Sequence, residues 1–206
     1  MLSADNEKEA LISVWAVYNG ELLTKSMMAV ELTEARFNPY INSHEFIVMG
    51  PSQFNFWRIG QSSLLEYQKF EPDVQQQGIL ETERFTSFTF TEVLKCIDSV
   101  LLLLGLSNGS IWAYNTRTNG FVISVSVSDS PVLALDYHDD IVCVGCLNEG
   151  SLRFWKTPSD LRYDNLNLFR DPEPRYITID GNPVAVCLRR GEGFVGTSGG
   201  SIWFIN

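Results

Sequence analysis

The segment GSIWAYN at residues 109–115 returns almost unchanged as GSIWFIN at residues 200–206, and this repeat decides the expected fold. All five tryptophans stand in similar apolar segments, with successive spacings of 42, 55, 43 and 48 residues: Trp15, Trp57, Trp112, Trp155 and Trp203. A period in the forties that ends in a Trp-bearing apolar strand is typical of the blades of a β-propeller.

The segments before the tryptophans support this interpretation. Residues 131–157 and 183–206 each read as strand, turn, strand, turn and strand. Their turns, such as HDD, NEG and SGG, contain residues that accept tight or positive-φ geometry. A fourth strand, such as GFVISVSVS, then leads to the next unit. The pattern predicts four-stranded antiparallel modules whose two apolar faces are covered by neighbouring modules.

We therefore expect an all-β fold, a β-propeller of four-stranded antiparallel blades that is incomplete, with about four to five blades. The chain begins late in one module, runs through three full modules and stops after the third strand of another. In this interpretation residues 1–206 form a single partial propeller domain. Its repeat units are expected at approximately residues 1–29, 30–72, 85–128, 131–180 and 183–206.

The tryptophans are interpreted as structural repeat positions that stacked sheets bury. Within GSIWAYN, Trp112 points to one face of the strand and Ile111 to the other. In GSLRFW the distance from Gly150 to Trp155 is five residues instead of three. A slip of two residues is one period of the pleat, so Trp155 can keep the same facing.

Charge and composition limit the partners and the compartment. The net charge of −10 and the pI near 4.6, without a Lys/Arg cluster, argue against nucleic acid and membrane surfaces as partners. The most apolar run, residues 99–106, is too short to span a bilayer as a helix, so no membrane insertion is expected. The start of the chain lacks the features of a secretory signal, and four cysteines suggest a reducing cytoplasmic compartment.

The cysteines are assigned to packing. Cys143 and Cys146 form a C-x-x-C pair, but an offset of three in a strand places the two thiols on opposite faces. Cys96 and Cys187 stand alone, and no second C-x-x-C completes a zinc site. A free cysteine commonly behaves as a small buried hydrophobic residue.

The remaining polar candidates are weak. His44 and His138 fall in predicted turns, and His138 beside Asp139 and Asp140 could belong to a metal or acid–base site. A solvated turn is favoured, because no second ligand set has useful spacing. Asp164, Asn165 and Asn167 are similar to the ligands of a calcium-binding loop. The Gly and the terminal Glu that such a loop requires are missing. We assign no catalytic, cofactor-binding or metal-binding residue.

Three other segments draw attention. The glycosylation sequon at residues 108–110 is interpreted as turn chemistry. Residues 156–180 mix Pro, charges and aromatic residues between two blade strands, and are the strongest candidate for an exposed, partner-binding insertion. Residues 75–84 are a weaker candidate of the same kind.

Residues 10–59 carry a resemblance to a known family. The segments are ISVWAVYNGELL, RFNP at residues 36–39 and MGPSQFNFW, followed by the polar excursion SSLLEYQKFEP. They resemble WD-repeat (WD40-like) proteins, and specifically the echinoderm microtubule-associated-like proteins and their centriolar and ciliary WD-repeat relatives. No Trp is followed by Asp here, and the Gly-His opening of typical repeats is absent, which favours the divergent, cytoskeletal branch.

The resemblance implies a non-enzymatic protein–protein interaction scaffold in a ciliary, centriolar or microtubule-associated assembly. Its implied partners are other proteins, including tubulin and ciliary or centriolar components, and its implied location is the cytoplasm, at the cytoskeleton, cilium or basal body. Two alternatives stay open. One is a general cytoplasmic WD-repeat adaptor unrelated to cilia. The other is a propeller enzyme with a pocket lined by residues such as His138 and Asp139.

Overall fold

The computed structural model describes residues 2–6, 10–28, 31–40, 44–60, 64–70, 76, 79–158, 168–169 and 174–206. These residues form eighteen β-strands, and the chain divides into two compact units, Met1–Phe85 and Thr86–Asn206. Within this described part of the chain, no helix has the length and apolar character needed to cross a membrane.

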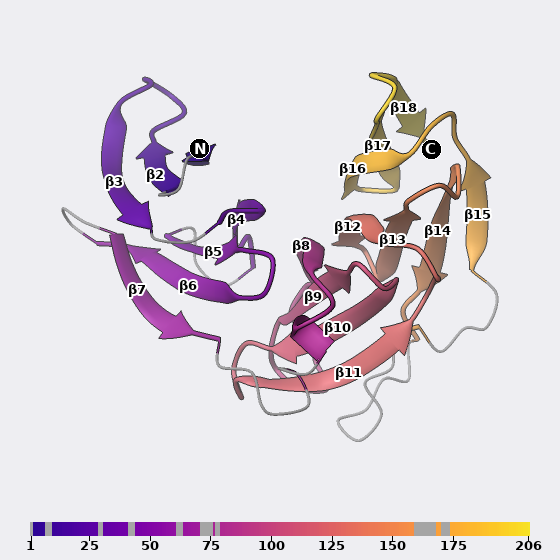
Figure 1. Ribbon diagram of the computed structural model, residues 1–206, viewed down its shortest axis with the longest axis horizontal. Helices are drawn as coiled ribbons and strands as arrows, with labels where there is room; N and C mark the ends of the chain where they lie inside the picture. Colours follow the sequence, from indigo (N-terminus) through magenta and orange to yellow (C-terminus); the bar gives the residue numbers. More distant parts are fainter. Residues whose placement is uncertain are drawn as a thin grey trace. The chain divides into compact units, whose positions relative to one another are not determined.

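The first unit contains two antiparallel sheets (Figure 1). The three-stranded sheet consists of β1 (Leu2–Asn6), β2 (Ala10–Trp15) and β3 (Leu22–Met28). The four-stranded sheet consists of β4 (Glu34–Phe37), β5 (Glu45–Met49), β6 (Phe54–Ile59) and β7 (Leu64–Lys69). Strands that are consecutive in sequence are neighbours in each sheet, so both sheets are simple meanders.

The core of the first unit lies between these two sheets. Ile12 and Val14 of β2 are almost fully buried and pack against Phe46 and Trp57 of the four-stranded sheet. On the opposite face of β6, Phe54 stacks on Phe70 with ring centroids 4.5 Å apart. The four-stranded sheet is therefore covered on both faces, as its continuous apolar strands require.

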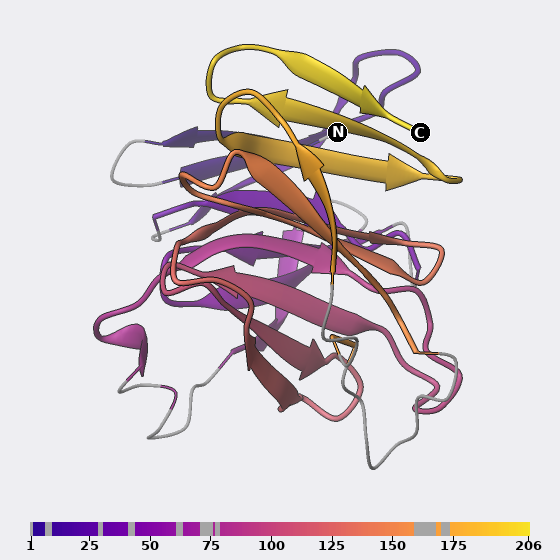
Figure 2. The same ribbon diagram turned by 90° about the vertical axis from the view of Figure 1, so that its right-hand side faces the viewer.

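The second unit contains three antiparallel sheets, which follow one another in chain order (Figures 1 and 2). The first consists of β8 (Phe85–Phe90), β9 (Leu101–Leu106), β10 (Ser110–Asn115) and β11 (Gly120–Ser126). The second consists of β12 (Val132–His138), β13 (Ile141–Cys146), β14 (Ser151–Lys156) and β15 (Arg175–Thr178). The third consists of β16 (Pro183–Arg189), β17 (Glu192–Thr197) and β18 (Ile202–Ile205).

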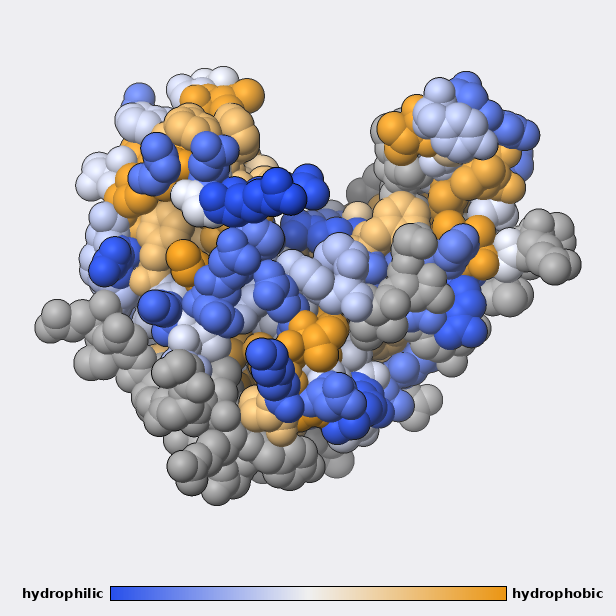
Figure 3. All heavy atoms as spheres, turned by 180° about the vertical axis from the view of Figure 1, so that it is seen from behind, coloured by the Kyte–Doolittle hydropathy of each residue, from blue (hydrophilic) through white to orange (hydrophobic). Residues whose placement is uncertain are grey.

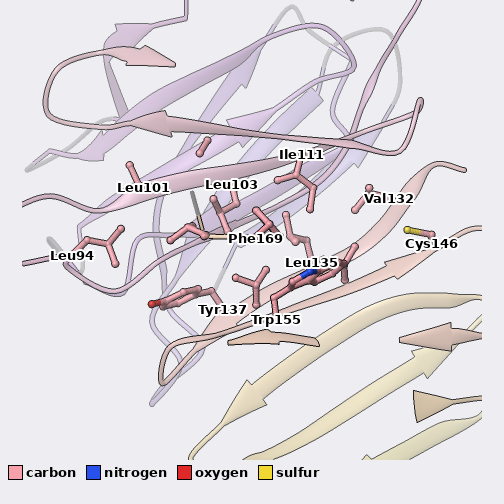
Figure 4. Close-up of a cluster of buried hydrophobic side chains, with 14 of the residues drawn as sticks. Leu94, Leu101, Leu103, Ile111, Val132, Leu135, Tyr137, Cys146, Trp155 and Phe169 are labelled. Atoms are coloured by element: carbon pink, nitrogen blue, oxygen red, sulfur yellow. The ribbon is translucent and has the colours of Figure 1, made fainter. Parts of the chain in front are cut away.

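Successive sheets of the second unit pack face to face. We call the face that packs on the preceding sheet the front face, and the face that receives the following sheet the back face. Between β8–β11 and β12–β15, Leu103 and Ile111 of the back face contact a front face that includes Leu135, Tyr137 and Trp155 (Figure 4). Every one of these five side chains is at least nine-tenths buried.

The next interface repeats this arrangement. Cys143 and Leu152 on the back face of β12–β15 are fully buried by a front face that includes Val186 and Val195 of β16–β18. In the first unit, Ile12 and Val14 likewise form a back face that receives the front face of β4–β7. The same stacking rule therefore holds at three interfaces between consecutive sheets.

The strand count follows the order expected from the sequence. Three strands form the first sheet, four form each of the next three, and three form the last. The expected all-β architecture of four-stranded antiparallel blades is confirmed. That residues 1–206 make one domain stays a prediction, as do the exact limits of the repeat units.

Candidate functional site

The five tryptophans lie on equivalent strands but at two register positions. Trp57 and Trp155 pair with the second residue of the strand before them, Phe46 and Val142. Trp112 and Trp203 instead pair with the fourth residue, Leu104 and Val195. Trp15 follows a bulge in the pairing with the next strand, as Trp57 does. Positions two residues apart share a face of the sheet, so Trp57, Trp155 and Trp203 belong to front faces, and Trp15 and Trp112 lie on the face opposite to the back-face residues of their own sheets.

Burial separates these tryptophans into groups. Trp57, Trp112 and Trp155 are buried, Trp15 is half-buried, and Trp203 is 38% exposed. Trp155 packs edge-on against Phe169, with ring centroids 5.4 Å apart. A role as a buried packing element fits the first three residues, and stays a proposal for Trp15 and Trp203.

The cysteine pair of β13 belongs to two different cores. Cys146 is buried between β8–β11 and β12–β15, whereas Cys143 is buried between β12–β15 and β16–β18. The prediction of opposite faces is thus confirmed. Burial raises the pKa of the Cys146 thiol to about 11, and burial also raises the pKa of Cys143 well above its usual value. Both thiols are in the environment of inert packing residues, not of nucleophiles.

A carboxylate that the sequence analysis did not single out ties three sheets together. Asp136 of β12 accepts a hydrogen bond from the Thr89 hydroxyl of β8 at 2.9 Å through one oxygen. Its other oxygen accepts from the backbone N–H of Leu188 in β16 at 2.6 Å. The available signal was one acid within the apolar strand VLALDYH. Such charge-assisted bonds fix the register between first strands of consecutive sheets.

One group of side chains has the composition of a metal or acid–base site. The ligand atoms of Glu92, His138 and Asp139 lie within 4.8 Å of one another. Glu92 Oε1 is 3.6 Å from His138 Nδ1, and Asp139 Oδ2 is 3.4 Å from His138 Nε2. The two carboxylates approach opposite nitrogens of the same imidazole ring, so these two contacts do not converge on one shared ion, as the ligands of a metal site do.

The turn that carries this group has its own structural explanation. Asp139 and Asp140 have φ values of 48° and 61°, which a tight hairpin turn between β12 and β13 requires. The Tyr137 hydroxyl lies 3.2 Å from Asp140 Oδ1, and the Asp139 side chain is 59% exposed. The turn is solvated at Asp139, but the His138 side chain is only 21% exposed, so the interpretation as a solvated turn stays a prediction for the histidine. Neither a metal nor an acid–base role has independent support. The second histidine, His44, is exposed next to β5.

The sequon at residues 108–110 forms a tight turn. The Ser110 N–H donates to Asn108 Oδ1 at 3.0 Å. Gly109 has a φ of 79°, and a Cβ at this position would lie 2.1 Å from the carbonyl oxygen of Ser128. Only glycine fits there, which confirms the interpretation as turn chemistry.

The expectation that residues 156–180 form an exposed insertion is wrong in part. Asp164, Asn165 and Asn167 lie outside the described residues. Leu168 and Phe169, however, are buried against the front face of β12–β15 instead of being exposed for a partner. Leu168 and Phe169 therefore belong to the core and are not open to a partner. The weaker candidate, residues 75–84, is described only in part, and its Leu80 is buried.

The turn between β2 and β3 presents the most exposed aromatic side chain of the described residues. Tyr18 is 88% exposed and Val17 is 82% exposed. The turn is nevertheless ordered, because Gly20 N–H donates to the Ala16 carbonyl at 2.9 Å and Asn19 Oδ1 accepts from the Glu21 N–H at 3.0 Å. A fixed turn that exposes a tyrosine loses little entropy when a partner binds.

The second unit contains a turn of the same construction. Between β10 and β11, the Asn119 N–H donates to the Asn115 carbonyl at 3.0 Å, and Asn119 adopts a positive φ of 58°, as Gly20 does with 70°. This turn presents Arg117 and Thr118 instead of two apolar side chains. The β2–β3 turn is therefore distinguished by its side chains and not by its backbone.

Comparison with known proteins places the fold. No family model matches the chain, and no curated protein matches it significantly. The β-propeller domain of Cps50 (Swd1) from Myceliophteria thermophila is similar with a TM-score of 0.68 and 17% identity, over 99% of this chain and 68% of that chain. U3-55K is similar with a TM-score of 0.68 and 13% identity, over 98% of this chain and 56% of that chain.

A third solved structure, of RRP9 WD40 repeats, has a TM-score of 0.65 and 14% identity, over 98% of this chain and 55% of that chain. The chain thus spans between 55% and 68% of the length of these three proteins. At such identities the likeness establishes the fold alone. The chain has the fold of part of a β-propeller, with antiparallel blades like those of these three structures.

Proposed function

We propose that this chain is a non-enzymatic scaffold that binds other proteins through turns held on stacked blades. The observation that carries the proposal is the ordered β2–β3 turn, which exposes Tyr18 and Val17 almost completely. Tyrosine is enriched among the residues that dominate binding energy at protein interfaces. Loops on a rigid scaffold commonly carry binding, and WD40 propellers offer such loops at the ends of every blade.

The proposal extends to the setting in which the scaffold works. We assign it to a ciliary, centriolar or microtubule-associated assembly, because the resemblance to the echinoderm microtubule-associated-like group covers residues 10–59 and includes the Tyr18 turn. The net charge of −10 disfavours direct docking on the acidic surface of a microtubule. The expected partner is therefore a protein of such an assembly that offers an apolar pocket to Tyr18, or a less acidic surface of tubulin.

The test is capture of partners from an extract of ciliated cells with the full chain, followed by mass spectrometry. Wild type should recover cytoskeletal or ciliary proteins, and Tyr18→Ala should lose most of them. Thr118→Ala, in the equivalent turn of the second unit, is the matched control and should retain them. Equal recovery by Tyr18→Ala would refute the role of the turn. Recovery of the same partners from cells without cilia would favour a general cytoplasmic adaptor.

A further inference from the structure

The β2–β3 turn carries an acidic side chain beside its exposed apolar residues. Glu21 is exposed and lies directly before Leu22, where β3 begins. Among the residues that the structure describes, no lysine or arginine forms an ion pair with its carboxylate. The negative charge of this turn is therefore not neutralised by the described part of the chain and can be offered to a partner.

Other charged side chains show the alternative, which is pairing within the chain. In the first unit, Glu45 pairs with Arg58 at 2.6 Å. In the turn of the second unit that is equivalent to the β2–β3 turn, Arg117 lies 3.8 Å from Asp98 and donates to the carbonyl of Ile97. The charge of that turn is thus satisfied by its own unit, whereas the charge of the β2–β3 turn is not.

The carboxylate of Glu21 is also held in place by the turn itself. Asn19 binds Glu21 twice, because its Oδ1 accepts from the Glu21 N–H at 3.0 Å and its Nδ2 donates to Glu21 Oε2 at 3.1 Å. The Ala16 N–H donates to the Glu21 carbonyl at 2.8 Å and closes the base of the turn. A carboxylate that is already positioned loses less side-chain entropy when a cation binds.

The same turn presents an aromatic ring and an aliphatic side chain. Tyr18 and Val17 are both more than four-fifths exposed. Figure 3 shows hydrophobic and hydrophilic residues next to each other at the surface of this part of the molecule, at the upper right. The face of an aromatic ring attracts cations. Residues 17–21 therefore offer an apolar contact, a cation-binding ring and a carboxylate.

One type of side chain fits the ring and the carboxylate together. The guanidinium of arginine is planar and always charged, stacks on aromatic rings, and donates two parallel hydrogen bonds to a carboxylate. Lysine provides a compact charge without a planar face. Tyrosine and arginine are also both enriched at the centres of protein interfaces. The net charge of −10 favours the approach of a basic partner.

We propose that the turn of residues 17–21 recognises an arginine that has an apolar neighbour in a segment of a partner protein. The guanidinium stacks on the Tyr18 ring and pairs with the Glu21 carboxylate, while the apolar neighbour contacts Val17. The inference rests on the proposed function of this turn in protein binding, and it adds the chemistry by which the partner is chosen.

The test begins with a library of short random peptides displayed on phage, with the full chain as bait. A parallel selection uses Tyr18→Ala, which keeps the net charge of the chain and so identifies peptides that bind by charge alone. Among the peptides that need Tyr18, arginine next to an apolar residue should be several times as frequent as in the library.

A synthetic peptide from this set then allows affinities to be measured by fluorescence anisotropy. Tyr18→Ala should weaken binding by about 30-fold or more. Glu21→Gln should weaken it by about 3- to 10-fold and reduce its salt dependence, because the ion pair is lost. Replacing the peptide arginine by citrulline, its neutral analogue, should have a similar effect and leaves the protein unaltered. Glu31→Gln, at an exposed position beyond the far end of β3, is the matched control and should bind like wild type.

The outcomes separate this inference from the proposed function. Peptides that need Tyr18 but show no excess of arginine would overturn the inference and leave the binding role of the turn intact. So would a Glu21→Gln variant, or a citrulline peptide, that binds as tightly as its parent at low salt. A selection in which no peptide needs Tyr18 would instead overturn the binding role of the turn itself.

Discussion

The sheets β12–β15 and β16–β18 are built to the same register, yet their back faces have opposite environments. Leu152 is fully buried whereas Ile202, at the equivalent position, is 78% exposed. Cys143 is fully buried whereas Phe194 is 54% exposed. The residue types are equally apolar, so the local sequence does not set the difference. Burial of these back-face side chains therefore comes from the sheet that packs on them, as β16–β18 does on β12–β15, and not from their own strands.

The strongest way to break this comparison is to truncate equivalent side chains. Leu152→Ala should lower the free energy of unfolding by about 2–5 kcal/mol, because it opens a cavity between two sheets. Ile202→Ala should change it by less than about 0.5 kcal/mol, because that side chain already meets solvent. Urea denaturation, at protein concentrations that keep the chain monomeric, measures the free energy of unfolding of both variants. Equal losses would mean that the two back faces are not environments of different kinds.

A smaller effect is expected where the two sheets differ in polarity. Asp136→Ala should cost about 1–3 kcal/mol, because the partly buried Leu188 N–H and the Thr89 hydroxyl lose this acceptor. Cys187→Ala, at the equivalent position of β16–β18, should cost less than about 0.5 kcal/mol. Asp136→Asn keeps one acceptor oxygen and should fall between them. If Asp136→Ala were as stable as wild type, the carboxylate would not be tying the three sheets together.

The smallest effect concerns pH. Burial raises the pKa of Cys146 from 9.0 to about 11, so the unfolded chain loses this proton at a lower pH than the folded chain does. The contribution to stability is complete below pH 9 and is lost as the pH rises from about 9 to 11. Between pH 9 and pH 10 the free energy of unfolding should fall by about 1 kcal/mol from this thiol.

Denaturation of Cys146→Ala over the same pH range isolates that contribution, and the fall should become shallower. Val122→Ala, at an exposed position without a titrating group, serves as the control and should keep the slope of the wild type. An unchanged slope in Cys146→Ala would indicate that this thiol is not protected between the sheets.

The blade architecture could be predicted from the sequence because it depends on local patterns. Apolar strands in groups of three and four, separated by turns such as the SNG that precedes β10, recur with a period that few folds share. The opposite facing of Cys143 and Cys146 likewise follows from the two-residue period of a strand. These features need no knowledge of which sheet packs on which.

The features that the sequence did not reveal depend on packing between sheets. The hydrogen bonds that Asp136 accepts come from residues 47 and 52 positions away along the chain. Phe169 is buried against Trp155, contrary to the expectation of an exposed insertion. The sequence analysis predicted exposure because charged residues surround Leu168 and Phe169 in the sequence. The exposure of Trp203 could not be distinguished from the burial of Trp112, since their segments are nearly identical.

Hydroxyl-radical footprinting of the monomeric chain tests most directly whether each back face is covered by the following sheet. The oxidation rates of Phe194 and Phe204 should exceed that of Phe154 several times, although all three are phenylalanines on back faces. Similar rates at the three residues, at a protein concentration where the chain is monomeric, would contradict the stacking of β16–β18 on β12–β15 and the account built on it.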